Sequence, residues 1–232
     1  MGLFRRVSPI LTQLDSKGRS ERGEAWEKQV ADVSILRGLD THGSYQTILE
    51  KLLDEPKWQQ REMTFYGKKV VQPRLTAWYG DAGRTYLYSG IKNTPLPWTD
   101  LLRELKRRVE DCTDARFNSV LLNLYRNQND SMGFHSDDEK ELGDEPTIAS
   151  LSFGATRTFL FKHKHKKTDL VRLPLEEGTV LLMRGQTQAN WQHAINKENH
   201  PCGPRVNLTF RQIFTSAELD ALRLREYARR RA

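Results

Sequence analysis

Cysteine is scarce in this sequence: Cys112 and Cys202 are its two cysteines in 232 residues, and no CxxC pair occurs. A disulfide framework is therefore excluded, because such frameworks need several paired cysteines in a short chain. Cysteines that stay unpaired are typical of reducing compartments. We therefore expect an intracellular protein, located in the nucleus, the cytoplasm or both.

Long apolar runs are also missing. No segment approaches the roughly 20 apolar residues that span a bilayer, so we expect no membrane association. The opening segment, MGLFRRVSPILTQLDSKGRSERGE, lacks the apolar stretch of a secretory signal peptide. Gly2 does not indicate myristoylation, because Arg6 stands where that motif needs serine or threonine. The sequence contains no internal repeats, so nothing in it indicates a repeat architecture.

Acidic residues are fewer than basic ones, with 30 Asp and Glu against 37 Lys and Arg, so the formal net charge is +7. A basic balance favours a polyanionic partner such as nucleic acid. With 37% hydrophobic residues, the chain can bury a core, and its length suits one domain with terminal extensions. We expect a monomer with a flexible basic arm at 1–30, one main domain at 31–214 and a basic helix at 215–232.

Hydrophobic patterning predicts few helices and many strands. Residues 44–59 and 97–112 have helical spacing, and Thr215 with Glu218 forms a capping box at the start of the C-terminal helix. Short aromatic and β-branched runs broken by glycine fill residues 61–90. Further strands are predicted at 118–125, 147–153, 156–163, 171–175, 178–184 and 205–214. This pattern is typical of a mainly β fold with flanking helices, an antiparallel sandwich or jelly roll.

His135 and Asp137 form an H-x-D pair in the acidic stretch GFHSDDEKEL. Side chains two residues apart share one face of an extended segment, which suits a metal ion. His193, in a loop after the predicted strand 178–184, is the best candidate for a third ligand. Two histidines and one carboxylate form the facial triad of non-haem iron(II) oxygenases, although zinc takes the same ligands. Taken alone, His135 fits equally well as a surface histidine among acids.

The final predicted strand, RVNLTFR, carries polar residues on one face. Its alternation places arginines at both ends of that face, where burial would be costly unless they bind an anion. An arginine fork matches a carboxylate in bidentate fashion. The strand NSVLLNLY offers an amide and a hydroxyl in the same way. These polar candidates are Asn123, Tyr125, Arg205, Asn207, Thr209 and Arg211.

At this point the sequence resembles the AlkB family of iron(II)- and 2-oxoglutarate-dependent dioxygenases that repair alkylated nucleic acid. The matching motifs are NLY, HSDDE, IASLSFGATRTF, LPLEEGTVLLM, WQH and PRVNLTFR, in this order over residues 118–213. Upstream, FYGKKVVQPRLTAWYGDAGRTYLYSG resembles the nucleotide-recognition segment of the animal members. The resemblance implies that 31–214 is a dioxygenase domain with a double-stranded β-helix core, in which 61–90 recognises the nucleotide.

The resemblance also implies roles for single residues. It makes His135, Asp137 and His193 the iron ligands. The residues that would hold 2-oxoglutarate are Asn123, Tyr125, Arg205, Thr209 and Arg211. The residues that would contact the nucleic acid are Tyr66, Gly67, Lys68, Tyr86, Tyr88, Asp138 and Glu139. Tyr66 stands where duplex-repairing members carry a phenylalanine that fills the gap left by a flipped base.

Two further features, Trp78 and an H-x-H pair, are interpreted from the residues alone. Trp78 could stack on a base or belong to the core. We expect the H-x-H pair His163 and His165, which has four lysines around it, to lie in a solvated loop that faces phosphate rather than to bind a metal.

The function implied is oxidative demethylation of bases such as 1-methyladenine and 3-methylcytosine, in DNA and in RNA as a further substrate. Iron(II) would be the bound metal, and 2-oxoglutarate and dioxygen would be consumed. Formaldehyde, succinate and carbon dioxide would be released. Two alternatives stay open. The same chemistry could act on regulatory RNA methylation or on a protein side chain. A non-catalytic nucleic-acid-binding module would need a broken ligand set, and this set looks intact.

Overall fold

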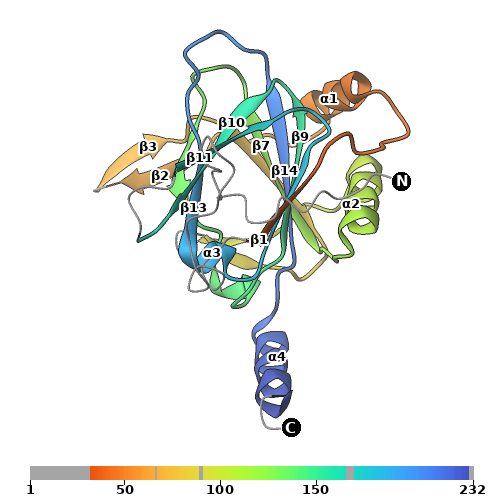
Figure 1. Cartoon of the computed structure of the whole chain (residues 1–232), viewed down its shortest axis with the longest axis vertical. Helices are drawn as coiled ribbons and strands as arrows, with labels where there is room; N and C mark the ends of the chain where they lie inside the picture. The colour runs from red at the N-terminus through yellow and green to blue at the C-terminus, as the bar shows by residue number, and fades with distance from the viewer. Residues whose placement is uncertain (1–31, 66, 89–90, 166–169, 230–232) are drawn as a thin grey trace, which may run out of the picture.

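The computed structural model describes residues 32–65, 67–88, 91–165 and 170–229. Two antiparallel β-sheets face each other at its centre (Figure 1). The predicted fold class, mainly β with flanking helices, is therefore confirmed. The arm predicted over residues 1–30 and the candidate Tyr66 lie outside the described residues.

The larger sheet has six strands in the order β1-β12-β9-β14-β7-β4. Their bounds are β1 (Asp32–Leu36), β4 (Leu75–Gly80), β7 (Ser119–Tyr125), β9 (Ile148–Gly154), β12 (Val180–Arg184) and β14 (Arg205–Arg211). Every neighbouring pair is antiparallel. The strand with the polar face, β14, lies between β9 and β7 and is almost wholly buried.

The smaller sheet has four strands in the order β11-β10-β13-β8. Their bounds are β8 (Met132–His135), β10 (Arg157–His163), β11 (Leu170–Leu175) and β13 (Trp191–Ile195). The prediction that His193 lies in a loop is wrong, because His193 lies on β13 opposite His135. β13 is an interior strand with both faces largely covered, so its residues do not alternate between polar and apolar. Strands β1 and β8 were not predicted either.

Two short hairpins complete the β structure. They are β2 (Glu62–Phe65) with β3 (Lys68–Val71), and β5 (Tyr86–Tyr88) with β6 (Ile91–Asn93). In the first hairpin, Phe65 pairs with Lys68. Gly67 has a φ of 74°, a left-handed conformation that glycine adopts without steric cost. The turn predicted at Gly67 is therefore confirmed.

Two helices cover the outer face of the larger sheet (Figure 1). Helix α1 (Tyr45–Asp54) begins after Ser44, whose side chain accepts a hydrogen bond from Thr47 N–H. Helix α2 (Asp100–Thr113) begins after Thr99, whose side chain accepts a hydrogen bond from Leu102 N–H. The buried apolar residues of both helices belong to one core cluster with the residues on one face of β14. These residues are Ile48, Leu49, Leu52, Leu102, Leu105, Val109, Val206, Leu208 and Phe210.

Because one face of β14 is in this core, its polar face must look toward the smaller sheet. The space between the two sheets is therefore lined by polar side chains from β7 and β14. The remaining short elements are a helix α3 (Thr187–Asn190) and a 3-10 turn η2 (Lys140–Leu142). Among the described residues, no helix is both long and apolar enough to cross a membrane.

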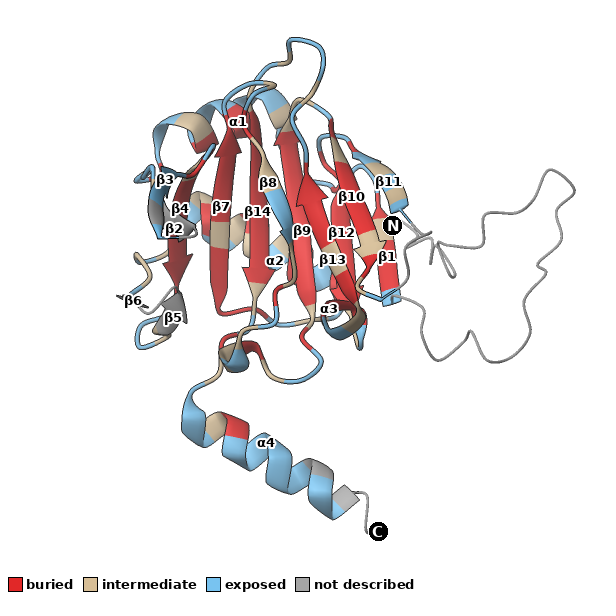
Figure 2. Ribbon diagram, turned by 90° about the vertical axis from the view of Figure 1, so that its left-hand side faces the viewer, coloured by how far each residue is buried: buried red, intermediate tan, exposed pale blue. Residues whose placement is uncertain are grey.

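Helix α4 (Ser216–Arg229) extends away from the sheets (Figure 2). The predicted capping box is present: Thr215 N–H donates to Glu218 Oε2 over 2.7 Å, and Glu218 N–H donates to Thr215 Oγ1 over 3.3 Å. Glu218 also pairs with Arg84, from the loop between β4 and β5. Hydrogen bonds from Arg84 and Thr215 lower the pKa of Glu218 to about 2. Arg84 thus ties the first turn of α4 to the larger sheet.

We expect Glu218→Gln to speed amide hydrogen exchange in α4 at neutral pH, because the ion pair with Arg84 is lost. A carboxyl whose pKa is lowered by folding stabilises the folded state above its ordinary pKa, and this effect disappears as the pH falls toward the lowered value. The difference from the wild type should therefore shrink between the ordinary pKa of 4.5 and about 2. Asp220→Asn, on the same helix, is the control. A difference that persists undiminished at the lowest pH would contradict the role of the pair.

Candidate metal centre

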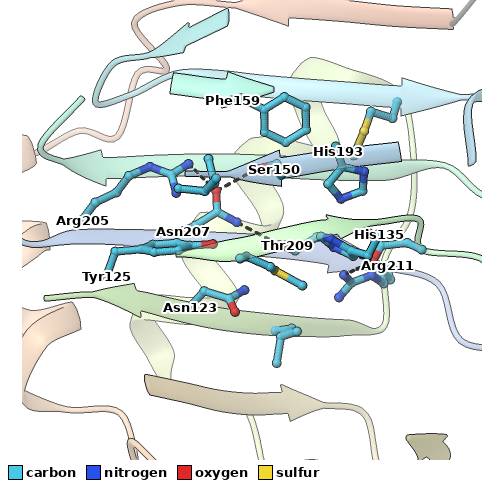
Figure 3. A pocket seen from close by; sticks show the side chains of 16 residues that line it. Asn123, Tyr125, His135, Ser150, Phe159, His193, Arg205, Asn207, Thr209 and Arg211 are labelled. Atoms are coloured by element: carbon cyan, nitrogen blue, oxygen red, sulfur yellow. Dashed lines mark hydrogen bonds and ion pairs between the residues drawn. The ribbon is translucent and has the colours of Figure 1, made fainter. Parts of the chain in front are cut away.

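Three potential metal ligands meet between the two sheets. His135 ends β8, Asp137 follows two residues later, and His193 lies in the middle of β13. One nitrogen or oxygen atom from each lies within 4.8 Å of the others. Figure 3 shows the two imidazole rings converging at one end of the cavity. In the part of the chain that the structure describes, this is the one cluster of three or more such side chains.

The His135 ring is oriented by its own strand. Its Nδ1 lies 2.9 Å from the Gly133 carbonyl oxygen. Because a carbonyl oxygen can only accept, Nδ1 carries a proton in this contact, and in the neutral ring the lone pair is on Nε2. That Nε2 atom lies 3.9 Å from Asp137 Oδ1. Histidines that bind metals are commonly held in this way by a backbone carbonyl.

The protonation states of the other two candidates also suit a metal. Burial disfavours the charged form of Asp137, but the charges of Arg211, His193 and His135 outweigh it and lower its pKa to about 2. Burial, assisted by His135, lowers the pKa of His193 to about 3. At neutral pH the centre therefore offers an ionised carboxylate and a neutral imidazole. Both are the forms that coordinate a divalent cation.

Two buried atoms of this cluster lack a hydrogen-bond partner among the described residues. They are Asp137 Oδ2 and His193 Nδ1. A buried ionised oxygen without a partner is costly unless a cation lies against it. The donor set of two nitrogens and one carboxylate is the one found in non-haem iron(II) sites with open positions. These residues therefore fit a divalent iron.

A network of polar side chains runs along the inner face of β14 (Figure 3). Arg205 Nη2 donates to Ser152 Oγ over 2.9 Å and to Asn207 Oδ1 over 2.8 Å. Asn207 Nδ2 donates to Thr209 Oγ1, and Ser150 Oγ donates to Asn207 Oδ1, each over 2.8 Å. The network fixes the guanidinium from one side and leaves its other donors facing the cavity.

Arg205 is 1% exposed, and its Nε and Nη1 atoms are buried without a hydrogen-bond partner among the described residues. Burial lowers its pKa to about 10, an effect that Tyr125 partly offsets. The side chain therefore remains charged at neutral pH. A buried cation with open donors is unfavourable by itself and suits an anion placed between its nitrogen atoms.

Arg157 is the contrasting buried arginine. The guanidinium carbons of Arg157 and Arg205 each lie 5.4 Å from the centroid of the Tyr125 ring. Arg157, however, donates to the carbonyl oxygens of Asn127, Asp130 and Asn196, and pairs with Glu198. Its donors are used within the protein, so Arg157 has a structural role that Arg205 lacks.

The remaining candidates for the inner cavity also line it. Asn123 and Tyr125 come from β7 and Thr209 from β14, all within the same pocket as the metal cluster. Asn123 Oδ1 accepts a hydrogen bond from Arg74 Nε over 2.9 Å, which leaves the Asn123 NH₂ group as a donor. Arg211 Nη2 donates to Asp137 Oδ1 over 2.9 Å, so its near partner is the carboxylate of the metal cluster.

A second cavity adjoins the metal cluster, with Asp137 and His135 in its wall. Trp78 packs with Leu121, Leu142 and Ile213, so it is a core residue that also forms the apolar wall. The polar lining includes Arg61, Gln72, Arg74, Ser136 and Glu139. Of these, Glu139 was a sequence candidate, whereas Arg61, Gln72, Arg74 and Ser136 were not, because nothing in their local pattern marks them.

Asp138, a further substrate candidate, is not among the described residues that line either cavity. The Asp138 side chain is 62% exposed and lies 3.3 Å from Lys164 Nζ. Tyr86 and Tyr88 lie on β5, and Lys68 begins β3. The solvated loop predicted for the H-x-H pair is wrong for His163, which is 7% exposed. His163 ends β10 on the same face as Phe161, and its ring centroid lies 5.1 Å from that of Trp191.

Comparison with known proteins adds independent observations. A family model described as the 2OG-Fe(II) oxygenase superfamily matches residues 32–211. The chain is 49% identical to the alpha-ketoglutarate-dependent dioxygenase alkB homolog 3 of Homo sapiens over 176 residues, which is 72% of this chain and 61% of that protein. It is 37% identical to the DNA oxidative demethylase ALKBH2 of Bos taurus over 198 residues, which is 82% of this chain and 71% of that protein.

A solved structure entitled "The structure of OsALKBH1" matches with a TM-score of 0.57 and 16% identity, covering 78% of this chain and 96% of that one. At this identity the match supports the fold alone. The chain spans less than two thirds of the length of the alkB homolog 3 proteins that it matches.

Proposed function

Since the chain belongs to the AlkB family of the 2OG-Fe(II) oxygenase superfamily, we propose that it oxidatively demethylates alkylated bases in nucleic acid. The bases would include 1-methyladenine and 3-methylcytosine in DNA. The methyl carbon is hydroxylated and leaves as formaldehyde, while 2-oxoglutarate is converted to succinate and carbon dioxide.

The observation that carries this proposal is a single cavity with two opposite ends. His135, Asp137 and His193 form one end, and the donors of Arg205 that have no partner among the described residues lie at the other (Figure 3). 2-Oxoglutarate has a keto acid at one end, which suits a metal, and a carboxylate at the other, which suits an arginine fork. The polar side chains of Asn123 and Tyr125 lie along the path between them.

When bound, iron(II) with 2-oxoglutarate and dioxygen supplies the oxidising chemistry. The side chains of the protein bind and orient the metal and 2-oxoglutarate. Arg205 neutralises the distal carboxylate of 2-oxoglutarate, and the Asn123 amide and Tyr125 hydroxyl donate to its oxygens. Asp137 contributes one negative charge to the metal, and its bond from Arg211 keeps that carboxylate ionised and oriented.

The second cavity is the proposed place for the methylated base. A flat ring can lie against the apolar wall that Trp78 and Leu121 form, with its methyl group toward His135 and Asp137. 1-Methyladenine and 3-methylcytosine carry positive charge, which favours the carboxylate of Glu139 in the lining of this cavity and the exposed carboxylate of its neighbour Asp138. The formal net charge of +7 favours the phosphate backbone.

The proposal is tested by formaldehyde release from four substrates side by side: methylated single-stranded DNA, duplex DNA, RNA and a methylated peptide. We expect release from methylated DNA that requires both iron(II) and 2-oxoglutarate, and none from unmethylated DNA of the same sequence. Release from RNA alone would assign the activity to RNA. Release from the peptide alone, or from none of the four, would reject a nucleic-acid demethylase.

Tyr66 carries a separate prediction about substrate form. It precedes Gly67, where the β2–β3 hairpin turns, and an aromatic ring there can fill the gap that a flipped base leaves in a duplex. We expect Tyr66→Ala to reduce demethylation of duplex DNA while single-stranded DNA is processed nearly as before, because a single strand has no such gap. Val71→Ala, an exposed position at the other end of that hairpin, is the control. Equal losses on both substrates would reject this role.

A further inference from the structure

The backbone of Asp137 is held in an unusual way. Strand β8 ends at His135, so Asp137 has no place in the ladder of the smaller sheet, although it is buried. A buried backbone N–H needs an acceptor. The Asp137 N–H finds one in a side chain, the Oε1 atom of Gln188, over 2.9 Å.

Gln188 belongs to α3 and is 1% exposed. Its orientation follows from chemistry, because the Asp137 N–H must meet the oxygen and not the nitrogen of the amide. The Nε2 atom is left 3.4 Å from Met183 Sδ, and a thioether sulfur is a weak acceptor. A buried amide with so poor a second partner is costly. Of these two hydrogen bonds of the Gln188 side chain, the one from the Asp137 N–H is the stronger.

A second hydrogen bond joins the same two segments. Ser136 Oγ donates to the carbonyl oxygen of Trp191 over 2.8 Å. Trp191 begins β13, two residues before His193. The short stretch from Gln188 to Trp191 therefore holds the segment of Asp137 and leads directly into the strand of His193, so it fixes the two candidate ligands relative to each other.

We infer that Gln188 is a positioning residue of the metal centre, which acts through the backbone of Asp137 and thereby sets the affinity for the divalent metal. The inference rests on the proposed role of Asp137 as a metal ligand. Side chains that orient metal ligands typically change metal affinity about 10- to 100-fold when they are removed. Gln188 itself is not among the side chains of the ligand cluster.

Titration of Co(II) into the metal-free whole chain tests this inference without turnover, since Co(II) reports both affinity and coordination geometry through its visible absorption. Gln188→Met preserves volume and removes the oxygen acceptor. We expect it to weaken Co(II) binding at least about tenfold and to alter the absorption bands. Gln188→Glu keeps an acceptor oxygen and should retain more affinity than Gln188→Met. Gln186→Leu, an exposed position just before α3, is the control and should bind as the wild type does.

The outcomes separate the inference from the proposal beneath it. If wild-type protein and Asp137→Ala bind Co(II) alike, the proposed metal site fails. If the wild type binds through Asp137 and a folded Gln188→Met matches its affinity and spectrum, the inference is overturned. Should Gln188→Met not fold, Gln188→Glu decides. Co(II) binding close to that of the wild type supports the acceptor role, and loss of binding in a folded protein contradicts it.

Discussion

Asp137→Ala is expected to abolish demethylation, with a fall in turnover of more than about a hundredfold. Asp137 is the one carboxylate in the ligand cluster, and its negative charge is secured by a pKa of about 2. Loss of a ligand should cost more than the roughly 10- to 100-fold that loss of an orienting partner costs. Formaldehyde release at saturating iron(II) and 2-oxoglutarate measures the effect.

The control for this change is Asp144→Ala, which removes an exposed acid seven residues along the chain. It should turn over as the wild type does. Binding of undamaged DNA should survive in Asp137→Ala, because phosphate contacts dominate non-specific binding. Near wild-type turnover in Asp137→Ala would show that the metal ligands are wrongly assigned.

Arg205→Met is expected to raise the apparent KM for 2-oxoglutarate about 10- to 100-fold, since hydrogen bonds to a charged group contribute roughly 1.5–3 kcal/mol. In the apoprotein, the same change should leave Tm unchanged or raise it. Arg205 is buried with two donor atoms that have no partner among the described residues, so its removal relieves an unfavourable charge. Steady-state kinetics and thermal unfolding measure the two effects.

Arg157→Met is the matched comparison, because both arginines are fully buried beside the Tyr125 ring. It should destabilise the protein by several kcal/mol, at about 1–3 kcal/mol for each carbonyl left without a donor. If Arg205→Met kept the wild-type KM for 2-oxoglutarate and instead weakened DNA binding, Arg205 would be a phosphate contact.

The polar face of β14 was predictable because it depends on local order alone. Alternation along RVNLTFR separates Arg205 and Thr209 from Val206 and Phe210, and the structure places the first pair in the cavity and the second in the core. The capping box of Thr215 and Glu218 followed for the same reason, because its two residues lie three positions apart.

The strand that carries His193 was not predictable from its own residues. Trp191–Ile195 is a strand because β10 and β8 pair with it on both sides, and neither partner is near in sequence. The role of Gln188 was not predicted for the same reason, since its side chain accepts a hydrogen bond from Asp137, 51 residues away. His163 lies on the inner face of β10 although lysines flank it, because the register of the strand, not the local charge, decides which side chains are buried.

The most direct measurement is the yield of succinate and formaldehyde from the whole chain with a methylated single-stranded oligonucleotide, iron(II), 2-oxoglutarate and dioxygen. We expect one succinate for each formaldehyde, and neither product when iron(II) is omitted or when Asp137→Ala replaces the wild type. Formaldehyde release that continues without 2-oxoglutarate, or succinate formation that is unaffected by Asp137→Ala, would contradict an oxygenase centre built on His135, Asp137 and His193.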